Sequence, residues 1–201
     1  MANFADLSDR PFPWEQIQDM IELEMRIPMA FQEGLRFSIG GDIAQKRDWN
    51  VITALEYSQS PYRLGWFDRF QLCGSAFIEE RFRVAASHCR THDVLLDATG
   101  MGTFLPERLR DIGAKGFVFT LQKKLELIRN LQLIVEHREF KMPYIKTMID
   151  EFLYFEQEQA VISGKIRVGT QDAHDDTVIS TALAAWKLRK KARLPTRISM
   201  V

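Results

Sequence analysis

Residues 37–71 alternate between apolar, β-prone runs and short polar turns, a pattern that predicts three strands. The runs are FSIGGDIA, VITALEYS and YRLGWFDRFQ, and the polar turn QKRDWN separates the first two. Connections this short favour an antiparallel meander. Helical spacing follows in SAFIEERFRVAASHCR. The next run, DVLLD, is short and apolar enough to be a strand buried in the middle of a sheet.

The second half of the chain predicts further strands among helices. In chain order, the expected elements are a helix in FLPERLRDIG, a buried strand in GFVFT, a helix over residues 121–136, a helix from about Tyr144, a two-stranded ribbon in AVISGKIRV that turns at Ser163–Gly164, and a helix over residues 173–191. Strands and helices in this order predict an α/β fold, in which helices flank a mixed β-sheet.

The first 33 residues stand apart from this pattern. WEQIQDMIELEMRIP has the spacing of a short amphipathic helix that is closed by Pro28. Its position ahead of the strands favours a linker or a docking helix. The expected organisation is a linker or docking helix in residues 1–33, one globular domain in residues 34–193 and a C-terminal tail in residues 194–201.

Composition and charge narrow the class of protein. The 201 residues are 46% hydrophobic, which suits a soluble domain, and no run approaches the roughly 20 apolar residues that cross a bilayer. We therefore expect no membrane partner. Two cysteines, Cys73 and Cys89, provide neither a disulfide framework nor a zinc-binding CxxC pair. Lys+Arg and Asp+Glu both number 27, which excludes a strongly basic nucleic-acid binder, so DNA binding would need a partner or a tether.

Aspartates interrupt apolar segments at three places. Asp42 lies inside the first strand, Asp97 ends the buried strand, and Asp175 and Asp176 begin the last helix. Charged side chains are rarely buried unless they are paired or bind a metal. Carboxylate oxygens are the ligands that Mg²⁺ and Mn²⁺ prefer. Two such ions, about 3.5–4 Å apart, can activate a water and stabilise the leaving oxygen in phosphodiester cleavage.

Each aspartate also has a structural alternative. Asp42 follows Gly40–Gly41 and could lie in a turn or bulge, and Asp97 precedes Ala-Thr-Gly and could begin a loop. Asp175 and Asp176 both suit a helix N-terminus, where one could cap the helix while the other binds a metal. The joint pattern is harder to explain in structural terms than any single aspartate, which favours a carboxylate cluster.

Other polar and glycine residues nearby leave two interpretations open. His174 suits a side chain that orients a carboxylate or the attacking water, and equally a capping or surface histidine. Lys123 and Lys124 suit contacts with DNA phosphates or, more readily, a solvated helix face. Gly100 and Gly102 would let the backbone pass close to a metal or a phosphate.

Three motifs in this order, GGDIAQKRDWNVI, LLDATGMGTFLPERL and AHDDTVISTALAA, resemble the nuclease domain of the large terminase subunit of tailed bacteriophages. The similarity runs from about Phe37 to Lys187. It implies an RNase H-like fold, with an added β-hairpin that leads into the last acidic motif. It also implies a two-metal carboxylate site that uses Mg²⁺ or Mn²⁺. The acidic positions of the family fall on Asp42, Asp97, Asp175 and Asp176.

The resemblance implies a metal-dependent DNA endonuclease that cuts concatemeric viral DNA during genome packaging. The implied partners are double-stranded DNA, the terminase ATPase domain, the small terminase subunit and the portal protein. The implied location is the cytoplasm of the infected or lysogenic bacterial host. No G-x-x-x-x-G-K-[ST] motif occurs, so the ATPase part is absent and we expect an excised domain or the product of a split or truncated gene. Many relatives carry another acid where this sequence has TVIS, with Ser180.

Other classes of protein stay open at this point. A Holliday-junction resolvase or a DDE-type transposase would share the aspartates but would be expected to carry more basic surface. A non-catalytic docking module would fit the neutral charge, and aspartates dispersed in the structure would favour it. A nucleotide-binding regulator built around DATGMG would lack the phosphate-loop lysine.

Overall fold

Three antiparallel strands form the middle of a mixed β-sheet, as the apolar runs predict. The computed structural model describes residues 10–30, 32–44, 49–90, 93–99, 104–160, 165–169 and 174–188. The strands of the sheet lie in the order β5-β4-β1-β2-β3-β6. Their bounds are β1 (Phe37–Asp42), β2 (Asn50–Glu56), β3 (Tyr62–Phe70), β4 (Val94–Asp97), β5 (Ala114–Phe117) and β6 (Phe140–Lys141).

Strand direction decides which strand ends meet. β1, β2 and β3 are antiparallel neighbours, whereas β4 runs parallel to β1 and β5 runs parallel to β4. Parallel neighbours need long crossover connections. α2 (Ser75–Cys89) lies in the connection that leads to β4, and α3 (Phe104–Arg108) lies in the one from β4 to β5. The C-terminal ends of β1 and β4 therefore lie side by side at one edge of the sheet.

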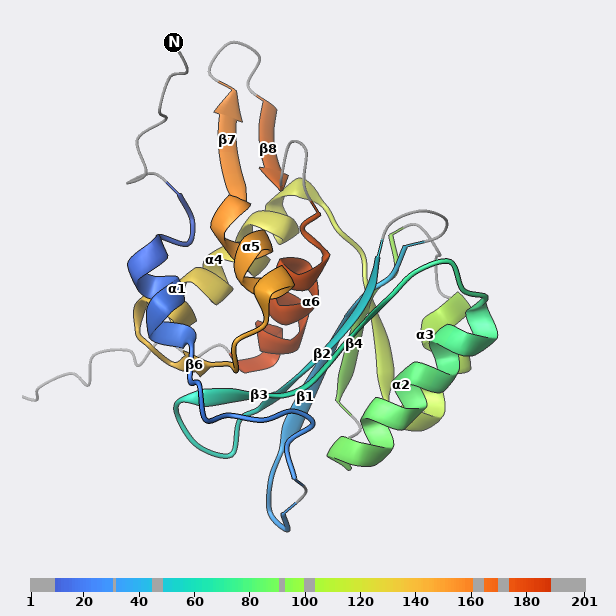
Figure 1. Ribbon diagram of the computed structural model, residues 1–201. Coiled ribbons are helices and arrows are strands. Elements are labelled where there is room, and N and C mark those ends of the chain that lie inside the picture. Colours follow the sequence, from blue (N-terminus) through green and yellow to red (C-terminus); the bar gives the residue numbers. More distant parts are fainter. Residues whose placement is uncertain are drawn as a thin grey trace, which may run out of the picture.

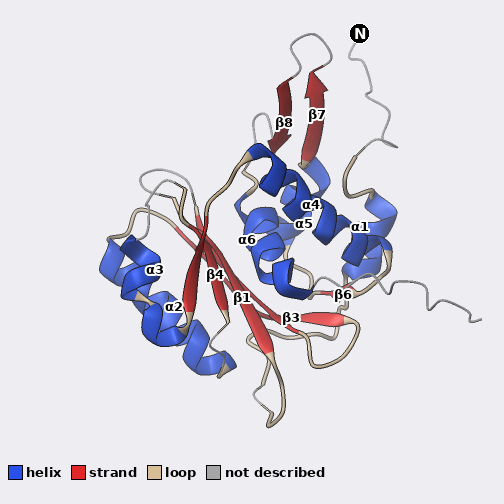
Figure 2. Ribbon diagram, turned by 180° about the vertical axis from the view of Figure 1, so that it is seen from behind, coloured by secondary structure: helices blue, strands red, loops and turns tan. Residues whose placement is uncertain are grey.

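Helices cover both faces of the sheet (Figure 1). α2 and α3 lie against one face, while α4 (Leu121–Glu136), α5 (Lys146–Tyr154) and α6 (Asp176–Ala185) lie on the other. α1 (Trp14–Met20) packs against α4 and α5 on that second side. In Figure 2, which shows the molecule from behind, the sheet separates the two groups of helices. A mixed sheet between two helical layers confirms the predicted α/β fold class.

Each face of the sheet has its own hydrophobic core. Leu55, Leu95 and Leu131 belong to the core under α4, α5 and α6. Phe82 and Leu96 belong to the core under α2 and α3. Side chains alternate between the two faces of a strand, so a sheet that is buried on both faces needs apolar residues at successive positions. This requirement explains why the segments VITAL and VLLD are almost continuously apolar.

α1 ends at Met20, and not near Pro28 as the sequence pattern predicts. After the helix the backbone pairs with Met142. The N–H of Met142 donates to the carbonyl of Met20, and the N–H of Glu22 donates to the carbonyl of Met142. These hydrogen bonds take the chain out of the helix well before the proline. Ile17 and Met20 are buried in the core beside α4 and α5, so α1 packs on the domain, while its role as a linker or docking helix stays a prediction.

β5 lies slightly earlier in the chain than the sequence pattern predicts. It covers Ala114–Phe117 and not the whole of GFVFT. The reason is its partner strand, because β4 ends at Asp97, directly opposite Phe117. Val118 has no strand partner beyond that point and its side chain is exposed.

The predicted hairpin is present. β7 (Glu156–Ala160) and β8 (Lys165–Gly169) pair antiparallel, and Figure 1 shows them projecting beyond the helical layer. β7 begins earlier than the segment AVISGKIRV predicts, and the expected turn at Ser163–Gly164 lies outside the described residues. α6 is shorter than expected and continues as a 3-10 turn over Trp186–Leu188; residues 189–191 are likewise outside the described part. Within the described ranges, no helix is long and apolar enough to span a membrane.

Candidate active site

The ends of β1 and β4 place two aspartates next to each other. The parallel register pairs Gly41 with Leu96, and the next residue on each strand is an aspartate, Asp42 or Asp97. Strand side chains point alternately to opposite faces of the sheet. Leu95 lies in the core under α6, so Asp97, two residues later, faces the same side.

Gly40 lets α6 lie directly on β1. A Cβ atom at this position would lie 2.0 Å from the carbonyl oxygen of Ser180 and 2.3 Å from the amide nitrogen of Ala184, both in α6. Only glycine permits two backbones to approach this closely. Asp42, two residues later on the same face of the strand, therefore points toward α6. Asp42 also pairs in regular register with Val51, so it lies in a strand and not in a turn or bulge.

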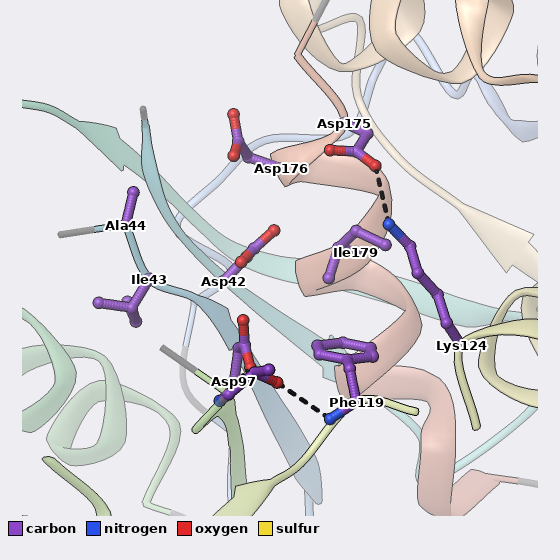
Figure 3. Close-up of a pocket in the computed structure, with 10 residues that line it drawn as sticks. Asp42, Ile43, Ala44, Asp97, Phe119, Lys124, Asp175, Asp176 and Ile179 are labelled. Atoms are coloured by element: carbon purple, nitrogen blue, oxygen red, sulfur yellow. Dashed lines mark hydrogen bonds and ion pairs between the residues drawn. The ribbon is translucent and has the colours of Figure 1, made fainter. Parts of the chain in front are cut away.

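The N-terminal end of α6 carries the other two aspartates. Asp175 immediately precedes the helix and Asp176 is its first residue. Together with Asp42 and Asp97 they line one pocket of about 340 Å³ (Figure 3). The structure thus brings the predicted site residues together from three separate segments. Among the described residues no three acidic, imidazole or thiol groups converge closely enough to enclose an ion, so the carboxylates line the pocket without a common centre.

Asp42 lies in an unfavourable environment for a negative charge. Burial is the main reason that the pKa of Asp42 lies well above its ordinary range. The charges of the other three pocket aspartates raise this pKa further, and Lys124 acts in the opposite direction. Like charges in a partly desolvated site disfavour ionisation in this way. A bound cation would favour the ionised carboxylates and so reverse the balance.

Asp97 and Asp176 each have a polar group close to the carboxylate. The backbone N–H of Thr99 donates to Asp97 Oδ1 at 2.7 Å, a turn that fixes the carboxylate at the end of β4. His174 Nδ1 lies 3.5 Å from Asp176 Oδ2. Of the two interpretations left open for His174, this contact favours a side chain that orients a carboxylate.

The two neighbouring lysines of α4 differ in their surroundings. Lys124 lines the pocket, and its Nζ donates to Asp175 Oδ2 at 3.3 Å (Figure 3). Lys123 is exposed, and its Nζ lies 5.8 Å from the centre of the Phe117 ring. The solvated helix face favoured by the sequence pattern therefore applies to Lys123, whereas Lys124 adds one positive charge to a pocket of carboxylates.

The side chain of Asp175 does not cap α6. Asp175 occupies the N-cap position but makes no side-chain capping hydrogen bond. Glu151 of α5 takes that role, because its Oε2 accepts both the backbone N–H and the hydroxyl of Thr177, each at 2.8 Å. Helix capping therefore does not explain Asp175, and the carboxylates of both aspartates line the pocket.

Sequence reasoning does not find Glu151, its partner Arg69, or Trp49, whose ring the guanidinium of Arg69 contacts. The signal for Glu151 is a charge at helical spacing from a buried residue, since Met148, three residues earlier, shares its side of α5 and is buried. A charge in such a position needs a partner. Arg69 and Trp49 leave no comparable trace, because their contacts join segments that are far apart in the chain.

Ser180 lies in the TVIS segment, for which the family resemblance implies a further acid, and here it is part of the packing. Its hydroxyl and that of Thr53 are hydrogen-bonded to each other at 2.8 Å, and both residues are fully buried. Ser180 therefore connects α6 to β2. Gly100 and Gly102, which were expected to let the backbone approach a metal or phosphate, lie outside the described residues.

The chain is similar in sequence to phage proteins. No model of a known protein family matches the chain. The chain is 27% identical over 195 residues to the terminase large subunit of Thermus phage G20c, an alignment that covers 91% of this chain. It spans 39% of the length of that protein.

Solved structures give the same relationship at the level of the fold. The crystal structure of the large terminase nuclease from thermophilic phage G20c with bound magnesium has a TM-score of 0.77 and 23% sequence identity, and covers 89% of this chain and 97% of that chain. The same nuclease has also been solved with cobalt and with zinc. The large terminase of thermophilic bacteriophage D6E has a TM-score of 0.65 at 12% identity, and covers 87% of this chain and 45% of that chain.

These matches extend over most of the described sheet and helices. They confirm the resemblance that the three acidic motifs carry. The chain has the RNase H-like fold of the phage large terminase nuclease domain, and over most of its length its sequence is similar to that part of the large terminase subunit.

Proposed function

We propose that this chain is a metal-dependent DNA endonuclease, the nuclease part of a large terminase, which cuts concatemeric viral DNA during packaging. One observation carries the proposal. Four aspartates from three separate segments line a single pocket, although the helix that bears two of them is capped by another residue. Separate structural roles would not explain why the four meet in one pocket, whereas a shared catalytic role accounts for them together.

The residues of the pocket fit hard divalent cations. Every acidic group that lines it is a carboxylate, the ligand type that Mg²⁺ and Mn²⁺ prefer over nitrogen or sulfur. Burial raises the pKa of Asp42 most and the neighbouring aspartates raise it further, and a cation would offset the repulsion between these carboxylates. Asp42, Asp97, Asp175 and Asp176 would hold the metal, most simply as two ions. When bound, such ions polarise the phosphate, activate a water and stabilise the leaving oxygen.

The protein's own groups have separate tasks in this proposal. Asp42 and Asp97 are held by adjacent strands, so their spacing is set by the sheet. Asp175 and Asp176 approach from α6. Lys124 offers a donor to a phosphate oxygen at the same pocket. Water attacks phosphorus, a new P–O bond forms, the bond to the 3′ oxygen breaks, and the products carry 5′-phosphate and 3′-hydroxyl ends.

The neutral charge of the chain fits an enzyme that receives its DNA from other components. Lys+Arg and Asp+Glu balance at 27 each, so long-range attraction to the duplex is weak. In the proposed setting, the terminase ATPase domain, the small terminase subunit and the portal protein would bring double-stranded DNA to the pocket. This would occur in the cytoplasm of the infected or lysogenic bacterial host.

The rival classes are less well supported. A docking module would not need aspartates gathered in one pocket, and the structure gathers them. A resolvase or transposase shares the fold class, but the sequence relatives found are large terminases. A nucleotide-binding regulator would not account for Asp42 or for the pair at α6.

The test is cleavage of supercoiled plasmid DNA with Mn²⁺, with Mg²⁺ or with EDTA. We expect nicking and linearisation that need a divalent metal and are lost in Asp42→Ala. Asp111→Asn is the matched control, because Asp111 is exposed and pairs with Arg83 on the opposite side of the sheet. Loss of activity in both variants, or retention in both, would count against the assignment.

A further inference from the structure

The N-terminal end of α6 is held from outside the pocket by a buried carboxylate. Glu151 is 6% exposed and uses both of its oxygens. Oε2 accepts the backbone N–H and the hydroxyl of Thr177, each at 2.8 Å, and Oε1 accepts Arg69 Nη2 at 3.1 Å. Burial raises the pKa of Glu151, while the hydrogen bonds from Thr177 and the charge of Arg69 favour its ionised form. Both oxygens of the Glu151 carboxylate are therefore hydrogen-bonded to protein groups.

A series of side-chain contacts also connects Glu151 with Asp176. The guanidinium of Arg69 lies 3.8 Å from the centre of the Trp49 ring, a cation–π contact. The Trp49 ring meets that of His174 edge-on, with centroids 6.5 Å apart. His174 Nδ1 in turn lies 3.5 Å from Asp176 Oδ2. The contacts therefore connect α5 and β3 to both the backbone and the side chains at the start of α6.

We propose that Glu151 is a positioning residue for metal binding, which places Asp175 and Asp176 by capping α6 from outside the pocket. This inference rests on the proposed function. Thr177, which Glu151 holds, is the next residue after Asp176, so a displaced cap moves the aspartate directly. Residues that orient metal ligands from behind typically contribute about 10- to 100-fold in metal affinity or activity.

Glu79 provides a matched comparison on the opposite side of the sheet. It is 7% exposed, close to the exposure of Glu151, and it accepts a hydrogen bond from Arg108 Nε. It belongs to α2, and it does not line the pocket. Removing either carboxylate leaves an arginine without its partner and should lower stability. Only the removal of Glu151 should also weaken metal binding.

The experiment is a calorimetric titration of the full chain with Mn²⁺ alone, for wild type, Glu151→Ala and Glu79→Ala. Circular dichroism and urea unfolding establish that each variant is folded. We expect Mn²⁺ affinity to fall about 10- to 100-fold in Glu151→Ala and to stay unchanged in Glu79→Ala. Glu151→Gln, which keeps an oxygen to accept the Thr177 N–H, should recover most of the affinity. Unchanged affinity in Glu151→Ala, or an equal loss in Glu79→Ala, would overturn the proposal.

A second variant serves if Glu151→Ala does not fold. Thr177→Val removes the hydroxyl donor at nearly constant volume and should weaken Mn²⁺ binding about threefold; wild-type affinity in that variant would overturn the proposal. Plasmid cleavage, measured separately, distinguishes failure of the proposed nuclease function from failure of the positioning role of Glu151. A chain that binds Mn²⁺ without cutting DNA refutes the proposed function, while the affinity comparison still decides the role of Glu151. A wild-type chain that binds no divalent cation overturns both.

Discussion

The two faces of the sheet are covered in different ways. α6 lies on β1 with its backbone, at Gly40, whereas α2 meets the neighbouring Gly41 through the ring of Phe82. On the α6 face the approach is set by main-chain atoms, which cannot be repacked. On the α2 face a side chain fills the space, and a side chain can adjust. The face that carries the acidic pair is thus the one whose geometry is fixed most tightly.

One face of the sheet carries the candidate site, and the other carries ion pairs that do not converge. Four carboxylates and Lys124 gather on the α6 side, and Glu151 holds α6 from behind. On the α2 side, Glu79 and Asp111 form ion pairs with arginines of the same layer. Charged groups are present on both faces, so it is their convergence, and not their number, that distinguishes the candidate site.

The largest expected effect comes from removing one carboxylate of the pocket. Asp97→Asn should reduce metal-dependent cleavage by about 10³-fold or more, since a metal ligand supports several kcal/mol of charge stabilisation in the transition state. Initial rates of plasmid nicking in Mg²⁺ measure this. Asp111→Asn on the α2 side should cut at the wild-type rate. Full activity in Asp97→Asn would contradict the assignment of the pocket.

A methyl group at either glycine of β1 tests the two packing modes directly. Gly40→Ala should destabilise the fold by about 3 kcal/mol, because the new Cβ meets the backbone of α6. Gly41→Ala should cost about 1 kcal/mol, because the ring of Phe82 can turn aside.

Urea unfolding and Mn²⁺ titration of the two glycine variants give the comparison. Gly40→Ala should also bind Mn²⁺ more weakly, since any shift of α6 carries Asp175 and Asp176 with it. Gly41→Ala should bind as the wild type does. Equal unfolding free energies, or equal Mn²⁺ affinities in the two variants, would show that the faces do not differ in the way proposed.

The high pKa of Asp42 predicts how stability depends on pH. The folded, metal-free protein holds this proton more tightly than the unfolded chain does, so stability falls as pH rises from the ordinary carboxyl range, about 4, through the raised pKa. Asp42→Asn removes that dependence and should raise the Tm of the metal-free protein at neutral pH by a few degrees.

Adding Mg²⁺ should reverse the order of thermal stability of the wild type and Asp42→Asn. Mg²⁺ should raise the Tm of the wild type and leave that of Asp42→Asn nearly unchanged, because a ligand that binds only the folded state stabilises it. Thermal unfolding in EDTA and in Mg²⁺, over a range of pH, measures both effects. A less stable Asp42→Asn variant in EDTA at neutral pH would contradict the electrostatic interpretation of this site.

Lys124 should give the smallest effect. Lys124→Ala is expected to lower kcat/KM about fivefold, since the side chain is partly exposed and its charge is screened by solvent. If it contacts a phosphate, the salt dependence of kcat/KM should also become shallower, with the slope against log salt changing by about one. Lys123→Ala, on the exposed side of α4, should leave rate and slope unchanged.

Local patterns were sufficient to predict much of the fold. The three-stranded meander, the buried strand before Asp97 and the helix over residues 121–136 all follow from the spacing of apolar residues. The end of α1 and the start of β5 could not be predicted in this way. Both are set by pairing with a distant strand segment, through Met142 and through β4, and a local pattern contains no information about that partner.

The residues of the candidate site likewise differ in whether the sequence alone predicts them. The four aspartates are visible in the sequence because each interrupts an apolar element. Glu151 is not, because its importance depends on Arg69 and Thr177, which reach it only in the folded chain. Residues that bind a metal can be recognised by type and context, whereas residues that hold them in place are identified by their neighbours.

The contact between Gly40 and α6 bears on when the proposed nuclease could cut DNA. Many enzymes delay their reaction by keeping the catalytic groups apart until a lid or loop closes. Here the backbones of β1 and α6 touch, so Asp42 cannot be withdrawn from Asp175 and Asp176 without breaking the core of the domain. For the proposed nuclease, the moment of cutting would then be decided by when DNA and metal reach the pocket, and not by assembly of the pocket itself.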